Sequence, residues 1–212
     1  MSTEKFLNLK IVLDRFINIL HDLYGFYLDA CQGFEFVSKH SQQFLHLPGR
    51  IVANGSPDDP NAVILNSSTW DEICSRNQQH GLNTEKTKHY VLVMILEHWN
   101  HDIRYKIAET IGVENTDEVK ADIMGDLNKI RNDLLHSRGR VNKSAGNIFI
   151  KLVKGSNIVI TSELFDKIFV EIFEYFNKLS IEQTGCTMYL DRSLHLQAKG
   201  IHRSMKHTIV ER

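Results

Sequence analysis

Apolar residues recur at helical spacing along most of this chain, with polar residues between them. The first such pattern covers residues 3–24, and a less regular one covers residues 26–46. Spacings of three and four residues predict an amphipathic helix over each range. The apolar positions of the first pattern are Phe6, Leu9, Leu13, Phe16, Ile17, Leu20 and Leu23.

Residues 47–83 are the least regular part of the chain. The stretch ANGSPDDPNA holds two of the three prolines, which predicts a loop. A short strand is expected over residues 61–67, in NAVILNS. A Ser/Thr cap, early acidic residues and a closing glycine predict a short helix within SSTWDEICSRNQQHG, residues 67–81.

Two longer helices are expected over residues 84–111 and 116–136. The helix over 84–111 begins apolar on two sides, which is typical of a central helix in a bundle. At about 1.5 Å per residue it would be roughly 40 Å long. The period then changes, because the β-branched runs NIFIKLV and NIVIT, residues 147–153 and 157–161, flank a glycine turn. This pattern predicts a β-hairpin.

A strongly apolar helix, capped by Thr161 or Ser162, is expected to run to about Leu179. The predicted fold class is therefore mainly α, a helical bundle with a small β-hairpin inserted before its last long helix. Residues 1–180 are expected to form a single domain that includes the irregular insertion, and residues 181–212 a polar tail.

Composition narrows the kinds of function that are open to the chain. A length of 212 residues is enough to bury roughly 70% of the unfolded surface. The net charge of -1 gives no global attraction to nucleic acid, so an anion site would have to be local. Three separated cysteines without a CxxC pair predict a reducing compartment and no zinc knuckle. Without a signal-peptide pattern or a membrane-length apolar run, a soluble, cytoplasmic chain is expected.

The candidate chemistry begins in KIRNDLLHSRGR, residues 129–140. Arg131 lies at the edge of the apolar stripe of its helix, where a guanidinium needs a carboxylate or a bound anion. Two interpretations are open. Arg131 forms a structural salt bridge with Glu97 or Asp126, or its planar fork of donors binds phosphate oxygens.

His136 closes the same predicted helix, five residues after Arg131. Five residues are about 140° around an ideal helix, so the two side chains do not share a face. The helix can end there, which would let the histidine swing or meet a partner across a symmetric interface. His136 either favours the negative end of the helix dipole or transfers protons near neutral pH.

The helix over 84–111 carries polar residues as well. Glu97, His101 and Arg104 follow one another at i, i+4 and i+7, which places them in one row. They form either an ordinary charge ladder or one wall of a polar cleft. A metal-dependent hydrolase using Glu97, His98 and His101 is disfavoured, because no second cluster supplies further ligands. No metal site is expected.

Residues 131–136, RNDLLH, match the R-N-x3-H form of the Rx4–6H motif of HEPN-domain proteins. EHWNHDIRYKIAETIG, residues 97–112, resembles the helix that precedes this motif in one defence-associated group, and GDLNKIRNDLLHSRG, residues 125–139, follows it as in that group. The resemblance covers residues 84–140. HEPN-domain proteins are helical bundles, and many are metal-independent ribonucleases of prokaryotic defence and toxin–antitoxin systems.

The resemblance implies a homodimer that brings two copies of the motif over one RNA strand. Arg131 would hold the scissile phosphate, His136 would act as general acid or base, and Asn132 would orient the histidine or the phosphate. Cleavage would leave a 2′,3′-cyclic phosphate and a 5′-OH, without a metal or other cofactor. Supporting groups would come from the neighbouring helix: Glu97, His101 and Arg104.

Two further expectations concern control and the alternative function. An operon partner would inhibit or activate the enzyme. The chain has no tyrosine two residues after His136, the feature of toxins silenced by nucleotidyltransferase antitoxins, so that control is not expected. The alternative is a catalytically silent HEPN scaffold that dimerises or binds a nucleotide.

Overall fold

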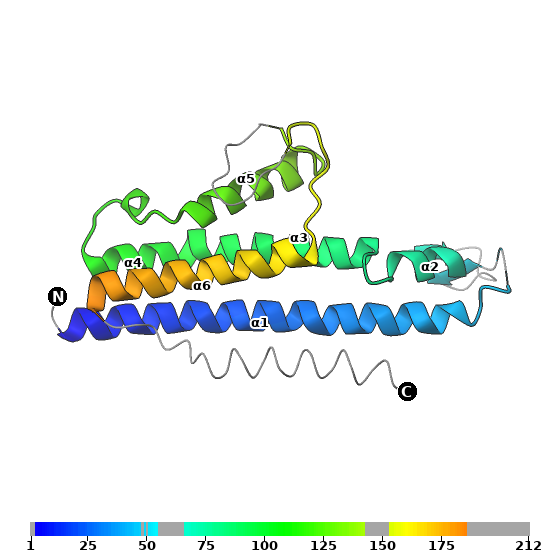
Figure 1. Ribbon diagram of the computed structural model, residues 1–212, viewed down its shortest axis with the longest axis horizontal. Coiled ribbons are helices and arrows are strands. Elements are labelled where there is room, and N and C mark those ends of the chain that lie inside the picture. Colours follow the sequence, from blue (N-terminus) through cyan, green and yellow to red (C-terminus); the bar gives the residue numbers. More distant parts are fainter. Residues whose placement is uncertain (1–2, 48, 50, 55–65, 143–152, 186–212) are drawn as a thin grey trace.

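A computed structural model describes residues 3–47, 49, 51–54, 66–142 and 153–185. In chain order the elements are α1 (Thr3–Gln42), β1 (Ile51–Asn54), β2 (Asn66–Thr69), α2 (Trp70–Arg76), α3 (Leu82–His98), the π-helix η1 (Trp99–Ile103), α4 (Arg104–Ile111), the 3-10 turn η2 (Thr116–Glu118), α5 (Asp122–His136) and α6 (Ser162–Thr184). This order confirms the predicted mainly α class. Figure 1 shows α1 along the length of the molecule, with α3, α4 and α6 lying over it and α5 on the side away from α1.

Helix α1 is a single helix where the sequence predicts two, over residues 3–24 and 26–46. The apolar stripe continues at helical spacing across Gly25, from buried Leu20 to buried Tyr27. A Cβ at Gly25 or Gly33 would meet no atom within 4 Å, so neither glycine serves a close approach. An interior glycine costs a helix about 1 kcal/mol, which packing of the continuous stripe offsets.

The insertion at 47–83 contains more regular structure than predicted. Strands β1 and β2 pair antiparallel, with Ile51 opposite Thr69. The expected strand over 61–67 overlaps only the start of β2, and its first five residues lie outside the described residues. The predicted short helix is confirmed as α2. A capping box begins it, because Glu72 N–H donates to Thr69 Oγ1 (3.2 Å) and Thr69 N–H donates to Glu72 Oε2 (2.9 Å).

The helix predicted over 84–111 is present as α3, η1 and α4 in uninterrupted succession. Within it, the π turn is marked by Arg104 N–H donating to the Trp99 carbonyl, five residues back. The segment ends where Gly112 adopts a left-handed φ of 84°. It carries the polar residues of the candidate site along its middle.

Helix α5 begins at Asp122, six residues later than the predicted start at 116. Asn115 caps the short turn η2 by accepting from Asp117 N–H at 2.8 Å. The chain then leaves helical geometry, with ψ of 87° at Val119 and 108° at Ala121, and both side chains are buried. Burial of these two residues overrides the helical pattern of the sequence.

The segment after α5 differs from the predicted hairpin. Its first run, 147–153, lies outside the described residues except for Val153. The second run instead pairs with residues 139–141. Val141 N–H donates to the Ser156 carbonyl at 3.0 Å, and Ile158 N–H donates to the Gly139 carbonyl at 2.8 Å. The chain therefore returns to the end of α5 before α6 begins.

Helix α6 confirms the predicted last helix, with Thr161 as its cap, and runs past Leu179 to Thr184. Its rings close the core: Phe176 contacts Phe16 of α1 and Trp99 of η1, with ring centroids 5.0 and 5.6 Å apart. The first four residues of the predicted polar tail, 181–184, belong to α6, and residues 186–212 lie outside the described residues. None of the helices in the described part of the chain combines the length and apolar character needed to cross a membrane.

Candidate functional site

The candidate site lies where α5 passes the end of α3. Arg131 Nη2 donates to Glu97 Oε1 at 2.9 Å, and the two side chains are 25% and 35% exposed. Arg131 Nη1 donates to Asn132 Oδ1 at 3.0 Å. Arg131 Nε is enclosed and has no hydrogen-bond partner among the described residues. The expectation that Arg131 needs a carboxylate is confirmed, and the carboxylate is that of Glu97. Asp126, the other candidate, lies 3.5 Å from Lys129 instead.

Glu97 also holds a second residue of the row. His101 Nε2 lies 3.1 Å from Glu97 Oε2, so one carboxylate bridges an imidazole and a guanidinium. Asn132, Arg131, Glu97 and His101 therefore form a continuous polar chain across α3 and α5. His101 is 73% exposed, so this chain opens to solvent at its histidine end.

Arg104, expected in the same row, is directed elsewhere. Its Nε donates to the Val119 carbonyl at 3.1 Å, and its Nη2 lies 3.1 Å from Asp117 Oδ1. The π turn explains the difference, because its extra residue rotates every later position relative to a regular helix. Arg104 therefore attaches η2 to α4.

His136 is the last residue of α5, and its side chain is exposed. The helix stops there because Ser137 N–H and Gly139 N–H both donate to the Asp133 carbonyl, at 3.0 and 3.1 Å. Arg138 and Gly139 follow with left-handed φ of 53° and 73°. His136 and Arg131 therefore lie on different faces of α5, as the five-residue spacing predicts, and His136 is open to solvent.

The charges of the site depress the pKa of Glu97. The hydrogen bond from Arg131 is the main cause, and the charges of Arg131 and His101 act in the same direction against partial desolvation. Its pKa in the folded chain is therefore below the usual glutamate value of about 4.3. Ionised Glu97 stabilises the fold above that value, and this contribution is lost as pH falls through the folded pKa.

A pH-dependent effect of Glu97→Gln should follow. We expect the variant to be less stable than wild type at about pH 7. The difference in stability should shrink well below about pH 4, where Glu97 of the wild type is protonated and therefore uncharged, like glutamine. Urea unfolding at several pH values measures this difference. A stability gap that does not change with pH would show that Glu97 is not held ionised by Arg131.

Two polar networks were missed from the sequence. Asp102, in the π turn, lies 2.9 Å from Arg15 of α1 and 2.6 Å from Lys106, so it ties η1 to the long helix α1. Lys88 is fully buried on α3 and donates to the carbonyl of Ile160 and to Glu85. Its position in the apolar stripe, four residues before Leu92, was the available signal.

Metal ligands do not gather in the described part of the chain: no three His, Cys, Asp or Glu residues there lie as a metal ion would require. Comparisons with known proteins found no matching family, no matching curated protein and no matching solved structure. Function is therefore inferred below from the residues and their geometry. The arrangement offers a guanidinium fork for an anion and an exposed imidazole for proton transfer.

Proposed function

We propose that this chain is a metal-independent endoribonuclease of the HEPN type, acting as a cytoplasmic homodimer in prokaryotic defence or a toxin system. One observation carries the proposal. Within the RNDLLH segment, Arg131 donates both to Asn132 and to Glu97 of α3, while His136 is exposed at the end of α5. This contact between the motif and Glu97 supports the proposal.

The proposed reaction is a transesterification within one strand of RNA. The ribose 2′-oxygen forms a bond to the adjacent phosphorus, and the bond from phosphorus to the 5′-oxygen of the next nucleotide breaks. Arg131 neutralises the charge that develops on the phosphoryl oxygens. His136 takes the 2′-OH proton or gives one to the leaving 5′-oxygen. The products are a 2′,3′-cyclic phosphate and a 5′-OH.

Two copies of the chain account for the separation of these groups. Arg131 and His136 lie about 140° apart around one helix, so a single copy does not direct both toward one phosphate. Across a two-fold axis, an exposed His136 of one copy can approach the Arg131 of the other. An operon partner that exposes or covers this face would control the enzyme.

A scaffold without catalytic activity is the second candidate, and a specific contact favours it. Both terminal nitrogens of Arg131 are already engaged, one by Glu97 and one by Asn132. A guanidinium whose donors are bonded to side chains of the same protein is also typical of a permanent structural ion pair. In that case the chain would dimerise or bind a nucleotide without cutting RNA.

Incubation of total RNA with the purified chain in EDTA tests the proposal. Wild type should release discrete fragments with 5′-OH ends, recognised because they ligate only after phosphorylation. His136→Ala should cleave about 10²- to 10⁴-fold more slowly, the usual contribution of a general acid or base. His40→Ala, which removes an exposed histidine of α1, is the matched control and should cleave normally.

Three results would contradict the nuclease. Equal cleavage by His136→Ala would remove the histidine from the mechanism. Activity lost in EDTA and restored by magnesium or manganese would indicate a metal enzyme. Intact RNA in every sample, with all variants folded and dimeric, would favour the scaffold.

A further inference from the structure

One stretch after the motif carries basic residues without any acidic ones. Residues 134–162 contain Arg138, Arg140, Lys143, Lys151 and Lys154 but no aspartate or glutamate, in a chain whose net charge is -1. The near-neutral chain is therefore locally cationic in this stretch, as it is again over residues 192–210. A local concentration of positive charge of this kind attracts polyanions without a strongly basic protein.

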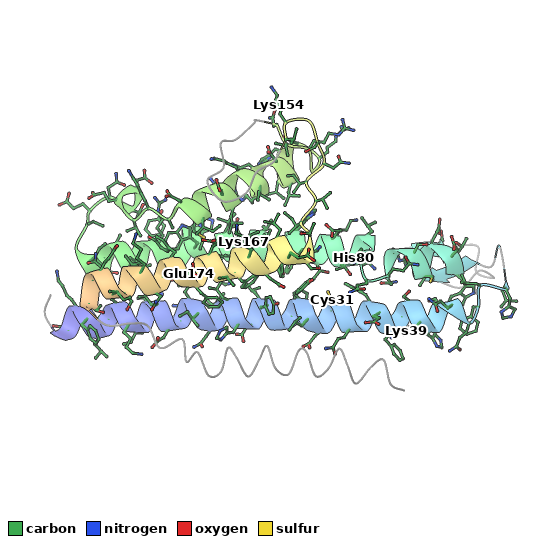
Figure 2. The ribbon with its side chains drawn as sticks, viewed as in Figure 1. Cys31, Lys39, His80, Lys154, Lys167 and Glu174 are labelled. Carbon is green, nitrogen blue, oxygen red and sulfur yellow. The ribbon has the colours of Figure 1, made fainter. Side chains whose placement is uncertain are left out.

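The fold gathers both ends of this stretch at one place. Residues 139–141 pair with 155–158, and Gly155 N–H donates to the Val141 carbonyl at 2.8 Å. Lys154 directly precedes the glycine that bonds to Val141, and Arg138 and Arg140 lie within three residues of Val141. All three side chains are exposed. Figure 2 shows Lys154 projecting beyond α5, on the side of the molecule away from α1. We name Arg138, Arg140 and Lys154 the basic turn.

The basic turn is charged and free of acidic partners among the described residues, where none of its three side chains forms an ion pair. Ion pairing is common elsewhere on this surface: Lys10 pairs with Asp14, and Lys39 with Glu35. Cations that remain unpaired can exchange their counterions for phosphates.

His136 is held at the same end of α5 as the basic turn. Arg140 N–H donates to the Ser137 carbonyl at 3.0 Å, so the chain turns tightly directly after the histidine. Arg138, two residues from His136, has a left-handed φ of 53°, a conformation that is uncommon for a residue other than glycine. The turn therefore holds the backbone of Arg138 and Arg140 within four residues of the exposed His136.

We propose that the basic turn binds the sugar–phosphate backbone of single-stranded RNA and leads the strand to His136. The inference rests on the proposed ribonuclease and adds the form of its substrate. Phosphate contacts position a strand without reading its sequence. A single strand is expected because in-line attack by the 2′-oxygen needs a backbone that can leave duplex geometry.

The test uses a fluorescent single-stranded RNA carrying 2′-O-methyl groups throughout, which cannot be cleaved by this route. Its affinity is measured against salt concentration for wild type and for the triple variant Arg138→Gln, Arg140→Gln, Lys154→Gln. The matched control, Lys39→Gln, Lys86→Gln, Lys167→Gln, makes the same charge change at exposed lysines of α1, α3 and α6.

Loss of three phosphate contacts should lower the slope of log affinity against log salt by about 2, at about 0.7 per contact on a single strand. Affinity at low salt should fall about tenfold or more in the triple variant and stay near wild type in the control. On cleavable RNA, KM should rise and kcat should change little, because the turn contacts the strand outside the reacting atoms.

Four results would overturn the basic turn as an RNA site: no binding by wild type, unchanged binding by the triple variant, an equal loss in the control, or displacement of RNA by polyglutamate at equal charge. The last result would indicate an acidic protein partner instead. The ribonuclease is judged separately, by cleavage of ordinary RNA. Binding without cleavage would keep the RNA site and reject the enzyme, whereas cleavage with unaltered binding would do the reverse.

Discussion

Replacing Arg131 by lysine should lower the rate of RNA cleavage by about 10²- to 10³-fold while the chain stays folded. Lysine keeps the positive charge and can still pair with Glu97, so the packing of α5 against α3 should change little. It cannot reproduce the planar fork that now contacts Glu97 and Asn132 at the same time. A fork of this kind is what holds two phosphate oxygens in fixed positions.

Single-turnover cleavage at saturating RNA measures this effect, and thermal unfolding verifies the fold. Arg104→Lys is the matched control, because Arg104 is bound to Val119 and Asp117 outside the polar row. We expect its cleavage rate to stay within about threefold of wild type, since a change remote from the reacting groups removes no transition-state interaction. Normal cleavage by Arg131→Lys would mean that the pair of Arg131 with Glu97 is structural only.

Replacing Lys88 by alanine should lower the free energy of unfolding by about 3 kcal/mol. The Lys88 side chain is fully buried, and its ammonium donates to the carbonyl of Ile160 and to Glu85. Alanine would leave the carbonyl without its donor, leave Glu85 without its cation and open a void where the stem packs. Each of these changes is costly in a protein interior.

Lys88→Met separates the polar loss from the void, because methionine fills most of the space of the lysine stem. Its destabilisation in urea unfolding should be smaller than that of Lys88→Ala but still clear. Lys86→Ala, an exposed change on the same helix, should stay within about 0.5 kcal/mol of wild type. A Lys88→Met variant more stable than wild type would show that desolvation of the ammonium outweighs its contacts.

The helices with strong apolar periodicity could be predicted from the sequence, and the exceptions have identifiable causes. Helix α6 and the rod of α3, η1 and α4 are confirmed because long stripes leave little choice of period. The sequence predicts two helices over residues 3–24 and 26–46, but a continuous buried face joins them into α1 in the folded chain. Pairing of residues 139–141 with 155–158 could not be predicted, because residues 139–141 carry no strand pattern in the sequence.

Part of the candidate site was equally visible in the sequence. The partner of Arg131 could be predicted because an arginine at the edge of an apolar stripe requires a carboxylate, and Glu97 was one of two candidates. The row of Glu97, His101 and Arg104 assumed a regular helix, and the π turn removes Arg104 from it. No periodicity announces a π turn, because the buried positions keep nearly the same spacing on either side of it.

The order in which the core is completed has a consequence for synthesis of the chain. Helix α1 leaves the ribosome before α6, yet its Phe16 ring packs on Phe176 of α6, the last described helix. At about 5–20 residues per second, the roughly 120 residues between α1 and α6 take on the order of 6 to 24 seconds to translate. During that time the apolar surface of α1 that packs on α6 has no partner from α6. The nascent chain is therefore most prone to aggregate just before α6 is made and the core can close.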